Sequence, residues 1–248
     1  MQHEIVARAE WLAARKALLA EEKDLTRRRD ALAARRRELP WVRVEKDYRF
    51  EGPAGEVGLG DLFAGRGQLL VYHFMLGSGW GEGCPSCSYV SDHFDGCLPH
   101  LAARDVSLVA VSRAPAAEIA AFRRRMGWEF PWFSSFASDF NRDFGVSFAP
   151  EELQSGAVDY NYARGPFPVE EAPGLSAFAR DEAGAVFHTY STYARGLDGL
   201  IGTYNLLDLA PKGRDEAGLD FTMSWVRHHD RYEATAAGVC GCCATTRD

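Results

Sequence analysis

One short motif limits the possible folds and functions of this 248-residue chain more than any other feature, because it joins a local structure to a specific chemistry. The motif is the Cys-x-x-Cys pair Cys84 and Cys87, which follows an apolar run at 68–74 and opens a segment of helical character. A strand that leads into such a pair at the start of a helix is the arrangement of redox-active dithiols. The sequence therefore predicts a redox dithiol at this point of the chain.

The order of residues within the motif predicts different roles for the two cysteines. The first helical turn leaves backbone N–H groups unpaired and carries the positive end of the helix dipole. A thiolate at Cys84 is therefore expected to form more easily than in a free cysteine, whose pKa is about 8.5. Cys87 lies one turn further along and can reach back to close a short disulfide, while Pro85 fits the first helical position. Two alternatives stay open: unconnected buried cysteines, or half of a zinc site completed by the C-terminal tail.

Composition and charge set the broad class of protein. A hydrophobic fraction of 46% and a charged fraction of 25% are ordinary for a globular protein, and a net charge of −7 gives no reason to expect nucleic acid as a partner. No apolar run approaches the roughly 18 residues that cross a bilayer, and charges interrupt the N-terminal segment where a signal peptide would be apolar. We therefore expect a cytoplasmic protein without a membrane partner, in which six cysteines are reactive or metal-binding rather than structural.

Residues 4–39 predict one long helix, since they contain no Gly or Pro and are rich in Ala, Leu, Glu, Lys and Arg. An apolar residue at every seventh position forms a narrow stripe on a charged rod: Trp11, Leu18, Leu25, Leu32 and Leu39. Residues 1–40 hold ten Lys and Arg against seven Asp and Glu, a net charge of +3, so the remainder carries −10. We expect either an arm that packs on a partner subunit's acidic body in a homo-oligomer, or a helix packed on its own domain.

From residue 41 the pattern changes to alternating strands and helices, which we expect to form a domain over 41–232 before a flexible tail at 233–248. The expected elements are two strands and a turn at 41–59, a single helical turn at 60–63, a buried strand at 68–74, a helix at 84–104, a strand at 107–112, a helix at 116–126, a short strand at 130–135, an irregular loop at 151–172, a hairpin at 175–193 and a helix at 197–206. This order predicts an α/β domain with a central mixed sheet flanked by helices.

The order of elements resembles that of thioredoxin-like domains of the peroxiredoxin type, with a long N-terminal helical extension. The segment at 50–74 is similar to the opening of peroxiredoxin-like domains. Pro173 stands just before a strand, where thioredoxins place a cis-proline that shapes the substrate groove; the alternative is an ordinary proline at the end of a loop. Trp80 precedes the cysteine pair, as a tryptophan of the docking surface does in thioredoxins.

Longer stretches resemble a bacterial thioredoxin-like family catalogued as a domain of unknown function, number 899 in that series. The matching stretches are GCPSCSYVSDHFDG, VSRAPAAEIAAFRRRMGWEFPWFSS, DFNRDFGVSF, VFHTYSTYARGLD, GTYNLLDLAPKGRDE and WVRHHDRY. They extend from the first helix to about Tyr232, which implies a thioredoxin-like fold and leaves the substrate open.

Other histidine and cysteine residues suggest secondary roles. Strand alternation at 185–193 places His188, Tyr190 and Thr192 on one face. If that face is turned to the dithiol, His188 could shuttle protons or bind a metal; the alternative is a structural histidine held by hydrogen bonds. Cys97 is expected to be buried among apolar side chains. The tail thiols could resolve a mixed disulfide, bind Cu(I) or have no function: Cys240, Cys242 and Cys243.

Charged residues near the motif have simpler expected roles. Asp92, His93 and Asp95 are expected on the solvated face of the dithiol helix, and Glu82 would raise the thiol pKa if it lay close. The pair at 228–229 is expected to cap a final helix rather than bind a metal.

The leading hypothesis is a thiol–disulfide oxidoreductase in which Cys84 attacks and Cys87 resolves, acting without a cofactor on a disulfide-bearing protein or a small thiol substrate. Peroxidase activity is less favoured, because the segment before Cys84 lacks the threonine and proline that peroxiredoxins place ahead of their reactive cysteine. A copper-binding or metal-delivery protein using Cys84, Cys87 and His188 is the alternative from another class. A third alternative is an interaction module without catalysis, whose purpose is the helical arm.

Overall fold

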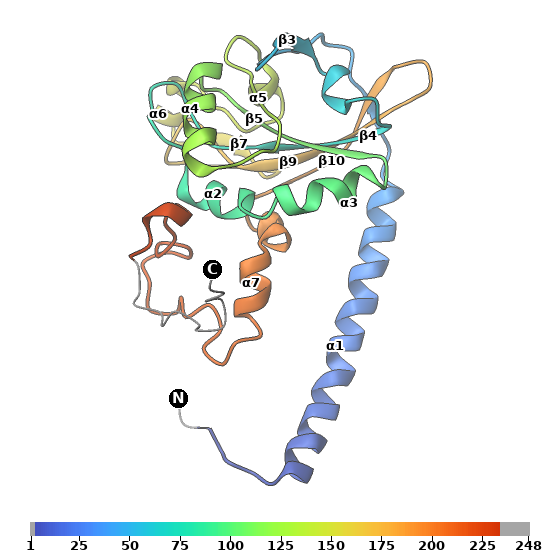
Figure 1. Ribbon diagram of the computed structural model, residues 1–248, viewed down its shortest axis with the longest axis vertical. Helices are drawn as coiled ribbons and strands as arrows, with labels where there is room; N and C mark the ends of the chain where they lie inside the picture. The colour runs from blue at the N-terminus through green and yellow to red at the C-terminus, as the bar shows by residue number, and fades with distance from the viewer. Residues whose placement is uncertain (1–2, 234–248) are drawn as a thin grey trace, which may run out of the picture.

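Eight strands form one mixed sheet in the computed structural model, which describes residues 3–233 (Figure 1). Their order across the sheet is β1-β10-β9-β4-β5-β6-β2-β3. Their bounds are β1 Val42–Arg43, β2 Arg49–Gly52, β3 Gly55–Gly58, β4 Gln68–His73, β5 Val106–Ser112, β6 Trp132–Ser134, β9 Gly174–Arg180 and β10 Val186–Tyr193, while β7 Val158–Tyr160 and β8 Ala163–Gly165 form a separate pair.

Seven α-helices and four short 3-10 helices accompany these strands within the described residues. The α-helices are α1 Arg8–Arg37, α2 Pro85–Ser91, α3 Leu98–Ala102, α4 Ala116–Met126, α5 Phe140–Asp143, α6 Pro150–Gln154 and α7 Gly202–Leu207. The 3-10 helices are Asp61–Phe63, Asp95–Cys97, Ala194–Leu200 and His229–Arg231. Figure 1 shows α2 and α3 running beneath the sheet, with α7 on their far side.

Strand β4 is the centre of the sheet and the element that leads into the cysteine pair. It pairs in parallel with β5 on one side and antiparallel with β9 on the other, and β9 continues through a hairpin into β10. The order β10-β9-β4-β5, with a helix following β4, confirms the expected thioredoxin-like α/β class. The central position buries β4 on both faces, which explains its unbroken apolar sequence.

Alternation along β4 separates two hydrophobic cores, one on each face of the sheet. Tyr72 and Phe74 point to the core that is shared with α2, α4 and α7. Leu69 and Val71 point to the opposite core, which the β2–β3 hairpin and α5 cover. Each of these side chains is almost completely buried, and full burial of a large apolar side chain stabilises the fold by roughly 1.5–3 kcal/mol.

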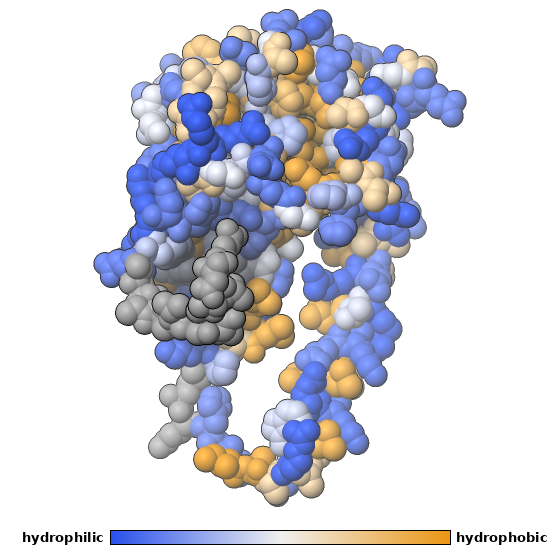
Figure 2. All heavy atoms as spheres, in the orientation of Figure 1, coloured by the Kyte–Doolittle hydropathy of each residue, from blue (hydrophilic) through white to orange (hydrophobic). Residues whose placement is uncertain are grey.

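Helix α1 extends away from the sheet and buries none of its side chains (Figure 1). The expectation that it packs on its own domain is therefore wrong. The residues of the seven-residue stripe are between 44% and 58% exposed, and Figure 2 shows apolar side chains along the free helix. Its end nearest the domain makes a cation–π contact, with the Arg36 guanidinium 5.6 Å from the centre of the Tyr190 ring. None of the helices within 3–233 is both long and apolar enough to cross a membrane.

Two local expectations are corrected by the structure. The predicted helix at 84–104 is broken into α2, a 3-10 turn and α3, because Gly96 is a poor helix residue and Pro99 lacks the N–H that a continuous helix needs. The stretch at 151–172 is not a plain loop, since it completes α6 and contains the β7–β8 pair.

Deletion of residues 1–39 is expected to leave the domain folded, because α1 buries no side chain. The free energy of unfolding should change by less than about 1 kcal/mol, as for other changes at exposed sites. If the exposed stripe packs on a second subunit, light scattering will show a smaller assembly after the deletion. An unchanged mass would contradict a role of the arm in oligomerisation.

Candidate active site

The two cysteines lie where β4 gives way to α2, as the sequence predicts. Cys84 is the N-cap residue of α2 and Pro85 occupies the first helical turn. The Cys84 N–H donates a 3.0 Å hydrogen bond to the Met75 carbonyl, which ties the motif to the end of β4. The Ser88 hydroxyl donates a 3.0 Å bond to the Cys84 carbonyl and strengthens the first turn. The pair is therefore held at a fixed position on the end of the central strand.

Gly83 and His228 fix the backbone immediately before the pair. A Cβ atom at Gly83 would lie 2.5 Å from the Phe74 ring and 2.7 Å from the Phe122 ring, so no larger residue fits there. His228 is 2% exposed, and its Nε2 donates a 2.8 Å hydrogen bond to the Gly83 carbonyl. Its Nδ1 then accepts a 3.0 Å bond from the Arg125 guanidinium, which selects the neutral tautomer with the proton on Nε2.

The ionisation of the two thiols differs because of their surroundings. A hydrogen bond from the Cys87 thiol is the main reason that the pKa of Cys84 is lowered to about 7; backbone N–H groups of residues 86 and 87 add to this, and burial opposes it. Burial is the main reason that the pKa of Cys87 lies well above its ordinary value, and the neighbouring Cys84 raises it further. The first cysteine therefore ionises while the second keeps its proton, which is the division of roles that the motif predicts.

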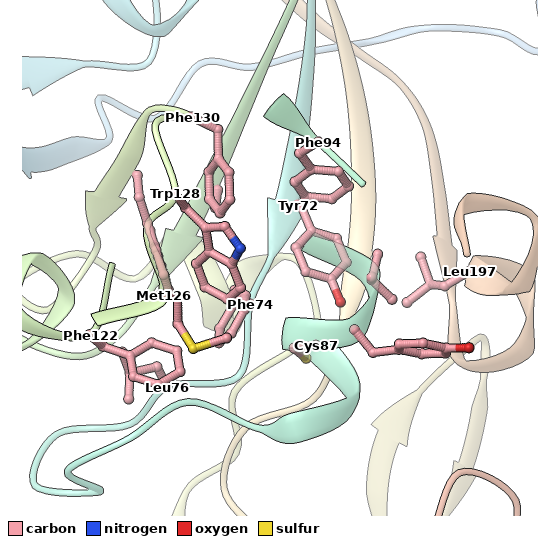
Figure 3. Packing of buried hydrophobic residues seen from close by; sticks show 14 of the residues in the cluster. Tyr72, Phe74, Leu76, Cys87, Phe94, Phe122, Met126, Trp128, Phe130 and Leu197 are labelled. Atoms are coloured by element: carbon pink, nitrogen blue, oxygen red, sulfur yellow. The ribbon is translucent and has the colours of Figure 1, made fainter. Parts of the chain in front are cut away.

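Tyr72 forms part of the surroundings of Cys87. Figure 3 shows its ring in the buried cluster with the hydroxyl directed toward the helix that carries Cys87. This hydroxyl is completely buried, and no nitrogen or oxygen atom among the described residues is a hydrogen-bond partner to it. Burial and, after it, the negative charge of a Cys87 thiolate raise the pKa of Tyr72 well above its ordinary value. Tyr72 therefore stays neutral and is available as a hydrogen-bond donor beside the dithiol.

Both cysteines line a hollow of about 430 Å³. One wall comes from the end of β4, α2 and the loop before β9, and includes Tyr72, Met75 and Pro173. The opposite wall comes from residues 194–223, which contribute apolar and charged side chains: Ala194, Arg195, Leu197, Asp198, Ile201, Tyr204, Arg214, Glu216, Thr222 and Met223. The sequence motifs gave no sign that this C-terminal segment returns to the cysteines, because the contact is made across more than a hundred residues.

His188 does not lie at the dithiol, which corrects the expected face of β10. The register shifts between His188 and Tyr190. His188 pairs with Phe178 and Tyr190 pairs with Ala177, so that two steps along β10 correspond to one step along β9. This β-bulge at Thr189 breaks the alternation and turns His188 to the sheet face opposite the cysteines, while Tyr190 faces α1.

On that opposite face His188 belongs to a chain of hydrogen bonds. Its Nε2 lies 2.8 Å from the Ser191 hydroxyl, which lies 2.8 Å from the Ser176 hydroxyl, and that in turn lies 2.8 Å from Nε2 of His73. Burial lowers the pKa of His188 and lowers that of His73 to about 3, so both rings are neutral near pH 7. The structural alternative for His188, a histidine held by hydrogen bonds, is the one that the structure supports.

The other predicted support residues have separate positions. Pro173 lines the hollow, but its peptide bond is not cis; cis peptide bonds do not occur in the described part of the chain. Trp80 is not part of the hollow, and its Nε1 donates a 2.6 Å hydrogen bond to Glu170. Glu82 forms ion pairs with Arg125 at 2.9 Å and Arg231 at 2.6 Å, which offset its negative charge.

Of the residues predicted on the solvated face, Asp92 is exposed and His93 and Asp95 are half-buried, and all three also have structural partners. The Asp92 carboxylate accepts a 2.8 Å hydrogen bond from Trp128 Nε1, and Asp95 accepts bonds from two backbone N–H groups at 129 and 130. His93 contacts Thr203 at the start of α7. Cys97 is exposed rather than buried; it ends the 3-10 helix Asp95–Cys97 that follows the end of α2 at Ser91. The tail cysteines lie outside the described residues.

The three ligands considered for the copper alternative, Cys84, Cys87 and His188, do not come together in the part of the chain that the structure describes. No group of three or more His, Cys, Asp and Glu side chains there has the arrangement needed to hold a metal ion. The cysteine pair alone remains, since the bulge in β10 removes His188 from it.

Comparison with known proteins places the chain in a family. A family model described as "Bacterial protein of unknown function (DUF899)" matches residues 1–232. No curated protein matches the chain. Solved structures that resemble it include the peroxidoxin BcpB from Mycobacterium tuberculosis, with 16% identity, a TM-score of 0.43, and coverage of 66% of this chain and 95% of that chain.

Two further solved structures show a similar degree of likeness. A peroxiredoxin Q from Xanthomonas campestris has 14% identity and a TM-score of 0.45, with coverage of 68% of this chain and 98% of that chain. A putative thiol:disulfide interchange protein DsbE from Chlorobium tepidum has 15% identity and a TM-score of 0.40, with coverage of 66% and 97%. These values are too low to transfer a residue role or an activity to this chain.

Replacement of His228 by Ala is expected to destabilise the protein by about 1–3 kcal/mol, because the buried Gly83 carbonyl loses its donor. The matched control is His229→Ala, whose side chain is exposed and pairs with Asp92, so that the loss should stay below about 1 kcal/mol. Urea unfolding of both variants measures the difference. Equal losses would contradict the assignment of His228 as the support of the motif.

The rate of Cys84 alkylation is expected to rise with pH through a midpoint near 7, because only the thiolate reacts and its pKa is lowered. Cys87→Ala should shift this midpoint upward, since the variant removes the thiol that donates to Cys84. Labelling with iodoacetamide at a series of pH values from about 5 to 10, read out by mass spectrometry of the Cys84 peptide, gives the midpoint of the wild-type protein and that of the variant. An unchanged midpoint in the variant would show that the thiol hydrogen bond does not control the pKa.

Proposed function

We propose that this chain, which belongs to the family described as "Bacterial protein of unknown function (DUF899)", is a thiol–disulfide oxidoreductase that uses Cys84 and Cys87. The observation that carries the proposal is the placement of the pair at the start of α2, with Cys84 as the partly exposed N-cap, Cys87 buried one turn further in and both on one hollow; the lowered pKa of Cys84 and the raised pKa of Cys87 agree with it. Structural cysteines have no need for such a difference, whereas thiol–disulfide exchange requires one thiolate and one reserve thiol.

The reaction follows from these protonation states. The Cys84 thiolate attacks one sulfur of a substrate disulfide, a new S–S bond forms at Cys84, and the other half of the substrate leaves as a thiolate that takes up a proton. Cys87 then loses its proton and attacks the Cys84 sulfur, which releases the second half of the substrate as a thiol. The two cysteines are oxidised to one disulfide, and one substrate disulfide is reduced to two thiols.

The surroundings favour this reaction over copper binding. Both cysteines face the same hollow, which gives a substrate disulfide access to the pair. A dedicated Cu(I) site would add a third soft ligand. His188, which was considered as that third ligand, lies on the other face of the sheet. We therefore do not carry the copper alternative forward as a second function.

Assembly is a separate part of the proposal. Helix α1 offers an exposed apolar stripe and a net positive charge, and the rest of the chain is acidic. These features support a homo-oligomer in which the arm of one subunit contacts another subunit, as proposed for the arm deletion above. Catalysis at Cys84 does not depend on this contact, since α1 contributes no residue to the hollow.

Cys84→Ser is expected to abolish disulfide reduction, because it removes the attacking thiolate. Cys87→Ser should accumulate a mixed disulfide between Cys84 and the substrate, because the resolving thiol is missing. Cys97→Ser is the matched control, since Cys97 is exposed and outside the hollow, and it should reduce substrate at the wild-type rate. Intact-mass measurement after acid quenching identifies the adducts, and a fully active Cys84→Ser protein would refute the proposal.

A further inference from the structure

The C-terminal segment gives the dithiol a wall that a simple Cys-x-x-Cys helix would not have. Residues 194–223 face α2 across the hollow, and Leu197 and Ile201 from this segment pack in the same buried cluster as Cys87. Figure 3 shows Leu197 and Tyr72 in the same buried cluster as Cys87, and all three also line the hollow. The cysteines therefore lie in a recess between two parts of the chain rather than on an open surface.

Glu216 is the hub that holds this wall in place. Its Oε1 accepts hydrogen bonds from the Tyr204 hydroxyl at 2.6 Å, the Trp225 Nε1 at 2.7 Å and the Met223 N–H at 3.0 Å. A single carboxylate oxygen thus joins α7 to the segment that follows it. Three donors to one charged acceptor make a strong junction, because hydrogen bonds to ionised groups are stronger than neutral ones.

Arg214 provides a second junction on the same wall. Its guanidinium donates to Asp208 at 2.7 Å and lies 3.3 Å from Asp198, and it stacks over the Tyr204 ring at 3.9 Å from the centroid. These pairs offset the charges of Arg214 and Asp198, and the three donors to Glu216 occupy its carboxylate oxygen, while most of the other residues that line the hollow are apolar. The wall is therefore a fixed part of the fold and offers little charge to attract an ionic substrate.

The size of the hollow limits what can reach Cys84. A volume of about 430 Å³ lies within the range of small-molecule pockets, roughly 300–1,000 Å³. A disulfide within a folded protein would have to bring the backbone on both sides of its half-cystine up to Cys84, past the wall at 194–223 that borders the hollow. A small disulfide needs room for only two short substituents.

Resting on the function proposed above, we infer that the substrate oxidant is a small disulfide with uncharged, mainly apolar substituents rather than a disulfide of a folded protein. One substituent occupies the hollow between α2 and the wall at 194–223 while Cys84 attacks the adjacent sulfur. The substrate S–S bond breaks, the bond between Cys84 and the occupying half forms, and the free half leaves as a thiol after protonation. Cys87 then displaces the bound half as a second thiol.

Single-turnover oxidation of the reduced protein tests the inference. The two probes are dipyridyl disulfide, which is small and uncharged, and insulin, whose disulfides belong to a folded protein. Dithiothreitol supplies the reference, because it reacts with both probes without a recess. For each reductant, the rate constant with dipyridyl disulfide is divided by the rate constant with insulin. This ratio should be about 100-fold or more larger for the protein than for dithiothreitol.

Two rim variants test whether the hollow is the place of binding. Thr222 and Arg195 both line the hollow with exposed side chains, so that Thr222→Trp and Arg195→Trp narrow its mouth without disturbing the core. Each variant should lower the rate constant for oxidation of the cysteine pair by dipyridyl disulfide by about tenfold. Leu206→Trp is the matched control, since Leu206 is 69% exposed on α7 and does not line the hollow, and its rate should stay within about twofold of wild type.

The outcomes separate the substrate class from the function itself. Oxidation of the pair by both probes, with the same ratio as dithiothreitol, would overturn the inference and leave the oxidoreductase in place. Unchanged rates in both rim variants would also overturn it. If neither probe oxidises Cys84 and Cys87, while both oxidise dithiothreitol, the proposed function is refuted together with the inference.

Discussion

The hydrogen bond from the Cys87 thiol to the Cys84 sulfur is the interaction on which the rest of the site depends. It lowers the pKa of Cys84 although that residue is largely buried, and burial alone would raise the pKa. The same burial keeps the proton on Cys87. In an exposed pair, the burial that separates the pKa values of Cys84 and Cys87 would be missing. In a pair with another spacing, the hydrogen bond between the two thiols would be missing. The recess and the motif thus act together.

The scaffold holds that contact from two directions. From the sheet, β4 ends at Met75, whose carbonyl accepts the Cys84 N–H. From the C-terminal part, His228 donates to the Gly83 carbonyl and is itself fixed by Arg125, which also pairs with Asp230 at 2.9 Å. The motif therefore lies between the central strand and a segment more than 140 positions later, so that loss of the C-terminal contacts would loosen the loop before Cys84.

The sequence alone was sufficient to predict the features that depend on neighbouring residues in the chain. The start of a helix at Cys84, the proline in its first turn and the hairpin of β9 and β10 follow from short patterns, and the structure has all three. The order of elements was sufficient for the α/β class and the thioredoxin-like arrangement. The prediction that Cys84 is the residue with the lowered pKa depended only on its place at the helix start, and the structure adds the thiol donor as the larger cause.

Other parts of the site depended on contacts that no local pattern encodes. The bulge at Thr189 changes the face of His188, and a two-residue alternation has no means of showing one inserted residue. The wall at 194–223 and the support from His228 arise from tertiary contacts over more than a hundred residues. Glu216 and Arg214 would look like ordinary surface charges in the sequence, because their partners are brought to them only by the folded chain.

The redox midpoint of the Cys84–Cys87 pair tests the central claim most directly. The protein would be equilibrated in buffers of defined thiol and disulfide ratio, quenched, and assayed by intact mass for the formation of one internal disulfide. The account predicts a two-electron transition between about −120 and −270 mV, the range of known exchange dithiols, which is lost in Cys84→Ser. A pair that stays reduced across the whole range, or an identical transition in Cys84→Ser, would contradict it.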